Sequence, residues 1–124
     1  MEARLPIARW MNLKISRGCC CSTVDLCTLK PLNEQTVLGS VRKTSRLLVV
    51  HEASGLCGLA AELGALAVTR AFESPRAPVV RLTGPDAPAA SSRALEQAAV
   101  PAVESVVESA LGLVQWKGRG SPPA

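Results

Sequence analysis

Five cysteines are the residues whose chemistry stands out first in this sequence. Three are consecutive, Cys19, Cys20 and Cys21, and the other two are Cys27 and Cys57. Structural zinc sites separate a chelating pair by two to four residues, so that both sulfur atoms can turn toward one ion. Consecutive cysteines point apart in an extended chain, and Cys57 belongs to no C-x-x-C pair. The pattern favours ordinary reduced thiols, and a thiol redox or metal protein stays as a further hypothesis.

His51 and Glu52 place the only histidine beside a carboxylate. They end a continuous apolar run, and the ligands of doubly wound sheets gather at the carboxyl ends of the strands. The pair could therefore transfer a proton. The alternative is that a lone histidine at a strand end hydrogen-bonds a neighbouring loop or subunit, and we favour this alternative. Ser54, Ser91 and Ser92 lack the sharp turn that exposes a nucleophilic serine, so serine hydrolysis is not expected.

The turn from Gly55 to Gly58 opens a predicted helix, where free backbone amides could bind an anion. It lacks the G-x-G-x-x-G order of dinucleotide sites, and tight packing between a strand and a helix is the alternative explanation of its glycines. Glu62, on an otherwise apolar helix, is expected at the solvent boundary or across a subunit contact. These residues nominate no complete active site. We therefore expect no catalytic, cofactor-binding or metal-binding residue in this chain.

The residues that would position these groups fall into alternating strand-like and helical segments. Apolar runs with β-branched residues predict strands, and apolar residues spaced three or four apart predict helices. Asn33 suits an N-cap, and Arg42 and Lys43 suit the end of a helix. The predicted strands are Thr23–Leu29, Arg46–His51 and Ala77–Thr83; the predicted helices follow Asn33, cover Gly58 to about Phe72, and begin near Pro101.

The order of these segments predicts an α/β fold with a largely parallel sheet. Arg46–His51 is apolar without alternation, as expected for an interior strand covered on both faces. Residues 89–93 are expected to form a loop. The last helix should turn Glu104 and Glu108 outward and its apolar residues inward, namely Val103, Val106, Val107 and Leu111. Three strands are few, so a further strand or another chain is expected to cover the edge beside the first.

The composition indicates one soluble globular domain. Of its 124 residues, 48% are hydrophobic and 19% are charged, which argues against wholesale disorder. The net charge of +4 comes mainly from the first seventeen residues, so we expect no basic face for nucleic acid. We expect no membrane span, since the best apolar window, Leu56–Val68, is interrupted by Glu62. Reduced thiols favour a cytoplasmic protein, and a weakly presequence-like start keeps the mitochondrial matrix as the alternative.

Several phrases occur in a specific order, and the longest are VDLCTLKPLN at 24–33, SVRKTSRLLVVHEA at 40–53 and APVVRLTGPDAP at 77–88. Together they resemble the carboxyl-terminal, transketolase-like domain of the β subunit of thiamine-diphosphate-dependent 2-oxo acid dehydrogenases. The resemblance covers residues 23–113, between an irregular segment 1–22 and a flexible tail 114–124. It implies a three-layer α/β/α unit with a mostly parallel sheet, whose first strand and helix are missing or replaced here.

The resemblance also implies what surrounds such a domain. The family's preceding domain, which carries β-subunit contacts to thiamine diphosphate, has no counterpart here, so this chain should bind neither that cofactor nor its magnesium. The implied partners are an α subunit, a β subunit and the dihydrolipoyl acyltransferase. Candidate interface residues are His51, Glu52, Glu62, Arg76 and Asp86. Arg76 stands where relatives commonly place an acid, and in some of them that acid helps hold the acyltransferase. The reversed sign argues against that docking.

Two hypotheses about function follow. The first is the carboxyl-terminal domain of the β subunit of a 2-oxo acid dehydrogenase decarboxylating component, which assists assembly and is inactive alone. The second is a non-enzymatic interaction module that pairs with a separately encoded partner that binds thiamine diphosphate. Under either hypothesis the chain departs from the family at two positions. Cys27 replaces a usual arginine, and Ser45 replaces a glycine where left-handed backbone suits glycine best.

Overall fold

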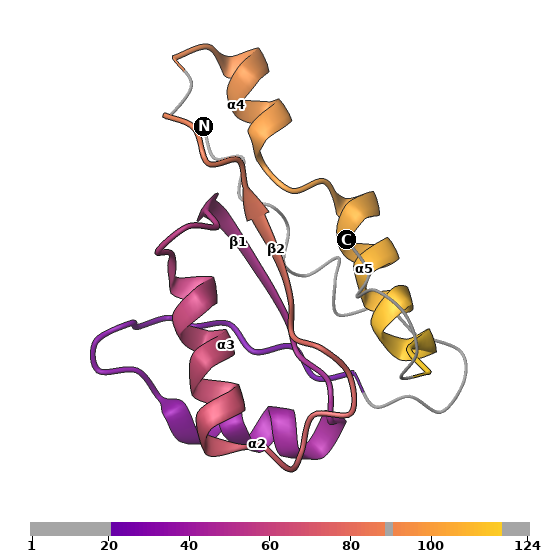
Figure 1. Ribbon diagram of the computed structural model, residues 1–124. Helices are drawn as coiled ribbons and strands as arrows, with labels where there is room; N and C mark the ends of the chain where they lie inside the picture. Colours follow the sequence, from indigo (N-terminus) through magenta and orange to yellow (C-terminus); the bar gives the residue numbers. More distant parts are fainter. Residues whose placement is uncertain (1–20, 89–90, 118–124) are drawn as a thin grey trace.

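The computed structural model describes residues 21–88 and 91–117, which form three layers of α/β/α type (Figure 1). Helix α3, with α2 packed beside it, covers one face of a small sheet, and α5 covers the other. This arrangement confirms the predicted fold class. The elements are α2 (Glu34–Thr44), β1 (Leu48–Ser54), α3 (Leu59–Arg70), β2 (Val80–Gly84), α4 (Arg93–Ala99) and α5 (Val103–Gln115).

Strands β1 and β2 pair in parallel, as the sequence predicted. Their register runs from Leu48 opposite Val80 to His51 opposite Thr83, and after an irregularity Ser54 lies opposite Gly84. The interior position predicted for Arg46–His51 is wrong for the described part of the chain, where the sheet has two strands and β1 has one neighbour. Its run of apolar residues is therefore not fully covered, and the side chain of Val50 remains 45% exposed.

The strand predicted at Thr23–Leu29 does not form. This stretch contributes one isolated antiparallel bridge, between Leu29 and Leu32, and forms no ladder of hydrogen bonds with a described strand. Strand propensity reflects packing on a sheet surface, so β-branched residues without a partner strand do not suffice. Leu26 nevertheless packs, partly buried, against the core cluster of Val37, Val49, Ala60 and Leu63.

Helix α2 forms where its caps predicted. The Asn33 side chain accepts a hydrogen bond from the Thr36 amide at 3.1 Å, and Val37, Leu38 and Val41 are buried. Ser45 ends the helix with a left-handed φ of 56°, and its amide donates to the Val41 carbonyl at 2.8 Å. Serine thus occupies the conformation that the sequence comparison assigned to glycine.

Helix α3 packs closely because small residues face its neighbours: Ala60 packs against Val49 of β1, and Ala67 packs against α2. Ala60 and Ala67 are completely buried and Leu63 is 5% exposed, whereas Leu66 and Leu59 only border the core. The helix begins at Leu59 after the N-cap Gly58 and ends at Arg70, slightly inside the predicted bounds. Phe72, placed at the end of the predicted helix, lies beyond it with 77% of its surface exposed.

Helix α5 is rotated relative to the prediction. Its buried residues are Val106, Ser109 and Leu113, while Val103 and Leu111 are each 39% exposed. The 3.6-residue period explains the difference, since residues 106, 109 and 113 form one stripe, and residues 103, 107 and 111 form the next. The helix starts at Val103, two residues after Pro101 and close to the predicted start, and Glu104 and Glu108 are exposed as predicted.

The carboxyl-terminal region contains more helix than the sequence indicated. Ser92 accepts a hydrogen bond from the Leu95 amide at 3.4 Å and caps α4, a short helix without buried residues that the sequence did not predict. Residues 114 and 115, expected in a flexible tail, extend α5, and Trp116 packs against Ala77, Val80 and Leu113. The packing of Trp116 keeps the last turn on the sheet.

One described segment, Arg93–Gln115, has the length and apolar composition of a membrane-crossing helix. It is not the window that the sequence analysis weighed. In the structure residues 100–102 are not helical, so the segment is divided into α4 and α5.

Arg46, in the connection from α2 to β1, holds the last turn of α5 at the start of the sheet. Its Nε donates to the Leu113 carbonyl at 2.8 Å, and its Nη2 donates to the Val114 carbonyl at 3.4 Å. These carbonyls belong to the last turn of α5, which has no intrahelical donors for them and carries the negative end of the helix dipole. A half-buried cation therefore anchors α5 to the chain that enters β1.

We expect the substitution Arg46→Met to lower the free energy of unfolding by about 1.5–3 kcal/mol, the range for a hydrogen bond to a charged group. Arg46→Lys should retain part of this stability, because it keeps the charge near the helix end. Urea denaturation followed by circular dichroism measures both. Equal midpoints for wild type and Arg46→Met would contradict an anchoring role.

Candidate functional site

The carboxyl ends of β1 and β2 lie side by side, and the loops that follow them, residues 55–58 and 85–88, meet there (Figure 1). Parallel strands bring ligand sites to this edge in α/β proteins. Three of the predicted interface residues lie at this edge: His51 and Glu52 in β1, and Asp86 just after β2. This edge is the candidate site.

Asp86 ties the two loops together. Its Oδ1 accepts hydrogen bonds from the Ser54 hydroxyl and, at 3.1 Å, from the Leu56 amide. The hydrogen bond from Ser54 lowers the pKa of Asp86 most, followed by the backbone hydrogen bond of Leu56, and the nearby Arg81 guanidinium lowers it further. These contacts favour the ionised carboxylate.

Arg81 completes this clamp between the loops. Its Nη1 donates to the Gly55 carbonyl at 3.1 Å, so that a side chain of β2 holds the loop after β1. The turn from Gly55 to Gly58, which the sequence analysis weighed as an anion site, thus presents its Leu56 amide to a carboxylate of the same chain. Its contacts support the alternative reading, in which the turn serves packing between strand and helix.

Close backbone approach explains the glycines of this edge. A side chain on Gly84 would overlap the Glu52 carbonyl oxygen, and one on Gly58 would overlap the Ser54 carbonyl oxygen. A Cβ on Gly55 would lie 2.8 Å from the Thr83 Oγ1 atom. The loops can therefore meet only because these positions lack side chains.

The His51 side chain does not make the hydrogen bond to a neighbouring loop that the sequence analysis expected. Its Nδ1 atom is buried and has no hydrogen-bond partner within the described ranges, so the predicted bond to a neighbouring loop does not form there. Glu52 is exposed, and successive side chains of a strand point to opposite faces. The two side chains therefore point to opposite faces of β1 and do not form a proton-transfer pair.

The other two candidate interface residues lie apart from each other. Glu62 is exposed in the first turn of α3, the helix that starts from the same edge of the sheet. Arg76 is exposed in the connection from α3 to β2, at the opposite end of the sheet, where its amide donates to the Ser45 carbonyl at 2.8 Å. One interface could include the first four candidates but not all five.

The cysteines do not form a site in the described part of the chain. Cys21, Cys27 and Cys57 are exposed and unlinked, whereas Cys19 and Cys20 lie outside the described residues. Within residues 21–88 and 91–117, no group of three His, Cys, Asp or Glu side chains could hold a metal ion. The hypothesis of a thiol metal site gains no support there.

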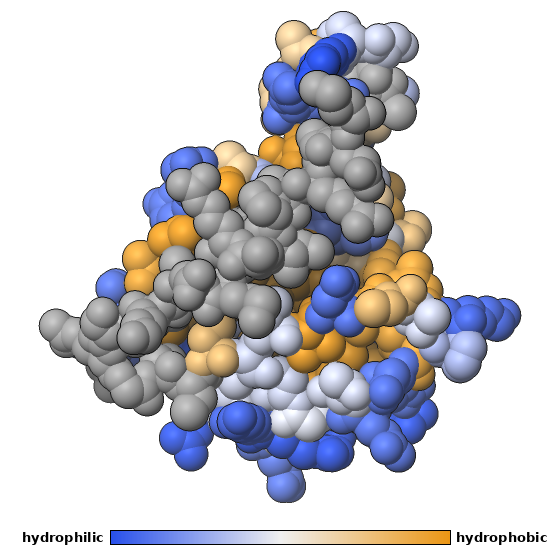
Figure 2. All heavy atoms as spheres, turned by 180° about the vertical axis from the view of Figure 1, so that it is seen from behind, coloured by the Kyte–Doolittle hydropathy of each residue, from blue (hydrophilic) through white to orange (hydrophobic). Residues whose placement is uncertain are grey.

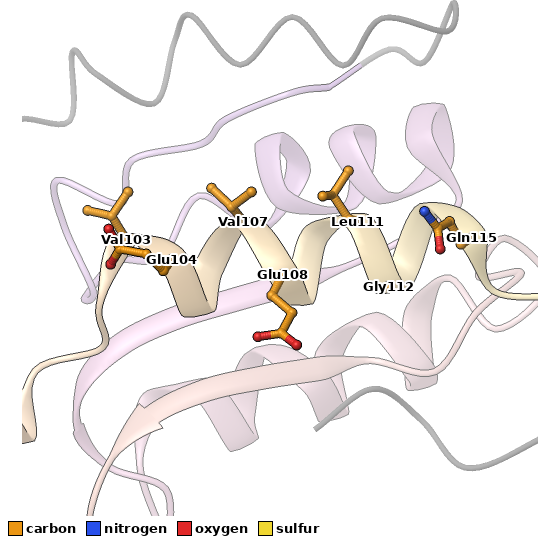
Figure 3. Close-up of a pocket in the computed structure, with 7 residues that line it drawn as sticks. All are labelled: Val103, Glu104, Val107, Glu108, Leu111, Gly112 and Gln115. Atoms are coloured by element: carbon orange, nitrogen blue, oxygen red, sulfur yellow. The ribbon is translucent and has the colours of Figure 1, made fainter.

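A separate groove of about 610 Å3 runs along α5 (Figure 3). The described residues that line it all belong to this helix, and they are Val103, Glu104, Val107, Glu108, Leu111, Gly112 and Gln115. The sequence analysis missed it because it assigned three of these residues to the core. The available signal was that Val103, Val107 and Leu111 are each four residues apart. They therefore form a stripe of their own, next to the buried stripe of Val106, Ser109 and Leu113.

Residues 12–106 match the family model described as the transketolase C-terminal domain. The match includes part of the segment 1–22, for which the sequence analysis expected no counterpart. A pyruvate dehydrogenase E1 component subunit beta from Rickettsia felis is 35% identical over 89 residues, which are 72% of this chain and 27% of the relative. The pyruvate dehydrogenase E1 component subunit beta-1, mitochondrial, of Oryza sativa is 38% identical over 93 residues, 75% of this chain and 25% of the relative.

A relative whose name gives a different activity shows similar identity. The acetoin:2,6-dichlorophenolindophenol oxidoreductase subunit beta from Bacillus subtilis is 33% identical over 98 residues. These residues are 79% of this chain and 28% of the relative. The chain therefore spans about a quarter of the length of the curated relatives that it matches.

We predict opposite effects for two substitutions of glycine by alanine. Gly84→Ala should destabilise the protein by more than about 1 kcal/mol, because the added methyl group meets the Glu52 backbone at a fixed strand end. Gly39→Ala, inside α2 with open space around it, should stabilise by up to about 1 kcal/mol through helix propensity. Thermal denaturation compares both with wild type. A tolerated Gly84→Ala would show that the loops do not approach closely.

The Asp86 clamp predicts a specific pH dependence. The folded-state pKa of Asp86 lies below its ordinary value of 3.8, so its contribution to stability is present above that value and is lost as the pH falls through the lower folded-state pKa. Asp86→Asn should therefore be less stable than wild type at pH 7, and the difference should shrink in this acid range. Urea midpoints between pH 7 and pH 2 measure this, with Glu73→Gln as the control. A difference that is independent of pH would contradict the clamp.

Proposed function

The chain belongs to the transketolase C-terminal domain family, and from that premise we propose that it acts as the assembly domain of a β subunit of a 2-oxo acid dehydrogenase decarboxylating component. It has no complete active site of its own. Its relatives are named as beta subunits, and therefore as parts of larger enzymes, and they are nearly three times as long as this chain. Decarboxylation of a 2-oxo acid would belong to the assembled enzyme.

The open side of the sheet is the observation that carries this proposal. Within the described residues β1 pairs with β2 alone, which leaves its other edge without hydrogen-bond partners and Val50 45% exposed. An unpaired edge beside exposed apolar residues favours association with another strand or chain. At the carboxyl ends of the strands, the Ser54 hydroxyl donates a hydrogen bond to Asp86, and Arg81 donates one to the Gly55 carbonyl. Those polar groups therefore support a structural role.

The described residues offer few ligands for thiamine diphosphate and magnesium, the cofactor of the family. Thiamine diphosphate is held with a magnesium ion, and magnesium takes oxygen ligands from carboxylates and carbonyls. No group of three His, Cys, Asp or Glu side chains that could hold a metal ion occurs in the ranges that the structure describes, and the Leu56 amide of the Gly55–Gly58 turn donates to Asp86. The residues present do not fit the cofactor, which supports the proposal that its site lies in another polypeptide or domain.

The proposed partners are an α subunit and a β subunit. His51, Glu52, Glu62 and Asp86 lie at one end of the sheet and could face one partner, while Arg76 lies at the other end. The exposed positive charge of Arg76 argues against a basic acyltransferase module at that position. The exposed free thiols of Cys21, Cys27 and Cys57 support a reducing compartment, and we propose the cytoplasm, with the mitochondrial matrix as the alternative.

Calorimetry tests the proposal that the chain does not bind thiamine diphosphate by itself. We expect no saturable binding when thiamine diphosphate and magnesium are titrated into the purified chain, because the described residues lack a matching ligand set. A family β subunit in complex with its α subunit is the positive control. Saturable binding at micromolar cofactor would contradict the proposal that the chain lacks its own site.

Association is tested separately with the chain co-expressed beside an α subunit and the preceding domain of a β subunit. We expect co-elution, weakened at least about tenfold by Val50→Asp, because a charge on the open side of the sheet would be buried without a partner. Leu95→Asp, on exposed α4, is the matched control. Elution with the preceding domain alone would favour the separately encoded interaction module, and a monomer in every mixture would overturn the assembly role.

A further inference from the structure

Basic side chains gather at the amino-terminal end of the sheet, opposite the candidate site. Helices α2 and α3 both end there, and the connection from α3 to β2 passes below them (Figure 1). The exposed basic residues are Arg42 and Lys43 in the last turn of α2, Arg70 in the last turn of α3, and Arg76 in the connection. Figure 2 shows, from behind, mainly hydrophilic side chains over this lower end of the molecule.

Two of these basic side chains serve the domain itself. Arg42 Nη2 donates to the Arg70 carbonyl at 3.3 Å, in the last turn of α3, where carbonyls lack helical donors. Arg70 Nη1 lies 3.3 Å from Oε2 of Glu34 and forms an ion pair with it. Lys43 suits the dipole of α2. Neither its ammonium group nor the Arg76 guanidinium, however, forms a hydrogen bond or ion pair with another described residue.

Phe72 adds an exposed aromatic ring to this charged surface. Ala71 is buried against Leu38 and Val41 of α2, and the next residue, Phe72, has 77% of its surface exposed. Val68, in the last turn of α3, is 47% exposed. A single exposed apolar residue is ordinary on a protein surface. Two of them beside unpaired cations resemble the aromatic anchors and charged rims of protein interfaces.

The ring and the unpaired cations lie within reach of one short peptide segment. The Arg76 amide donates to the Ser45 carbonyl at 2.8 Å, so Arg76 lies beside the end of α2 that carries Lys43. Phe72 precedes Arg76 by four residues, so their Cα atoms are at most about 14 Å apart. An extended segment of about five residues covers this distance.

The charge of this end favours an acidic partner. Glu34 is paired with Arg70, and Glu73 is the exposed acid in the connection, so basic residues outnumber acidic ones there. A basic segment would meet like charges. Nucleic acid is less suited, because proteins that bind its backbone neutralise several phosphates, and only Lys43 and Arg76 are unpaired among the described basic residues of this end.

We propose that this end of the domain binds an acidic segment of a partner protein. An apolar side chain of the segment packs against Phe72 and Val68, and its carboxylates pair with Lys43 and Arg76. The surface lies on α2, α3 and the connection to β2, apart from the open edge of β1. It therefore does not depend on the proposed assembly role, and its failure would leave that role intact.

The binding specificity of the full chain tests this surface. The probe is a fluorescein-labelled peptide, EELEEFEE, followed by fluorescence anisotropy. We expect saturable binding, at least about tenfold tighter than that of EESEESEE, which lacks the apolar side chains, or of KKLKKFKK, which has the opposite charge. The affinity should fall as the salt concentration rises from about 0.1 M to about 1 M, because salt screens exposed charges.

Substitutions on this surface have matched controls on α4. Arg76→Glu and Lys43→Glu should each weaken binding of EELEEFEE at least about fivefold by placing like charges together. Arg93→Glu, an equal change of charge at an exposed position of α4, should leave the affinity unchanged. Phe72→Ser should weaken binding at least about tenfold, and Leu95→Ser, which removes an apolar side chain that is 62% exposed, should not. Far-ultraviolet circular dichroism checks that each variant is folded.

Binding that requires both the charges and the apolar side chains of the peptide, and that is lost only in the Lys43, Phe72 and Arg76 variants, would support the proposal. No binding of EELEEFEE up to about 1 mM would overturn it. Equal binding by all variants would overturn it as well, because the peptide would then lie elsewhere. Tighter binding of phosphatidylserine vesicles than of EELEEFEE would identify a lipid surface as the partner, and self-association lost in Arg76→Glu would identify a second copy; either result contradicts the proposal.

Discussion

A sheet with two described strands offers little area for a core, and this constraint governs the rest of the structure. Val49 faces α3 on one side and Val80 faces α5 on the other, so each layer depends on a few buried contacts. Close approach compensates for the small area, since Ala60 lets α3 pack near Val49 and Ala67 lets it pack near α2. Arg46 and Asp86 then fix the layers at opposite ends of the strands.

Local signals predicted the elements whose ends are set by nearby residues. Asn33 predicted the start of α2, and the small apolar residues predicted α3. The alternation of strands and helices predicted the parallel pairing of β1 and β2. Features that depend on distant neighbours were not predictable in this way. Thr23–Leu29 has strand propensity but pairs with no described strand, and α5 is rotated because Trp116 and Leu113 pack on Val80. The spacing of apolar residues predicts that a helix such as α5 has apolar stripes. It does not predict which of two adjacent stripes packs against the sheet.

The candidate site shows the same division. Sequence reasoning selected the strand ends through His51, Glu52 and the glycine turn, and the structure brings them to one edge with Asp86. It could not find the clamp, because Ser54 lies 32 residues before Asp86 and Gly55 lies 26 residues before Arg81, and these partners meet only through strand register. The polar groups at this edge hold loops rather than a ligand, which is consistent with a domain that contributes architecture to a larger enzyme.

Complementation of a truncated relative tests this account most directly. A family β subunit that lacks its carboxyl-terminal domain would be combined with its α subunit, thiamine diphosphate and magnesium, and release of carbon dioxide from a 2-oxo acid measured with and without this chain. The account predicts activity only when the chain is added, and none from the chain alone. Carbon dioxide released by the purified chain by itself would contradict it.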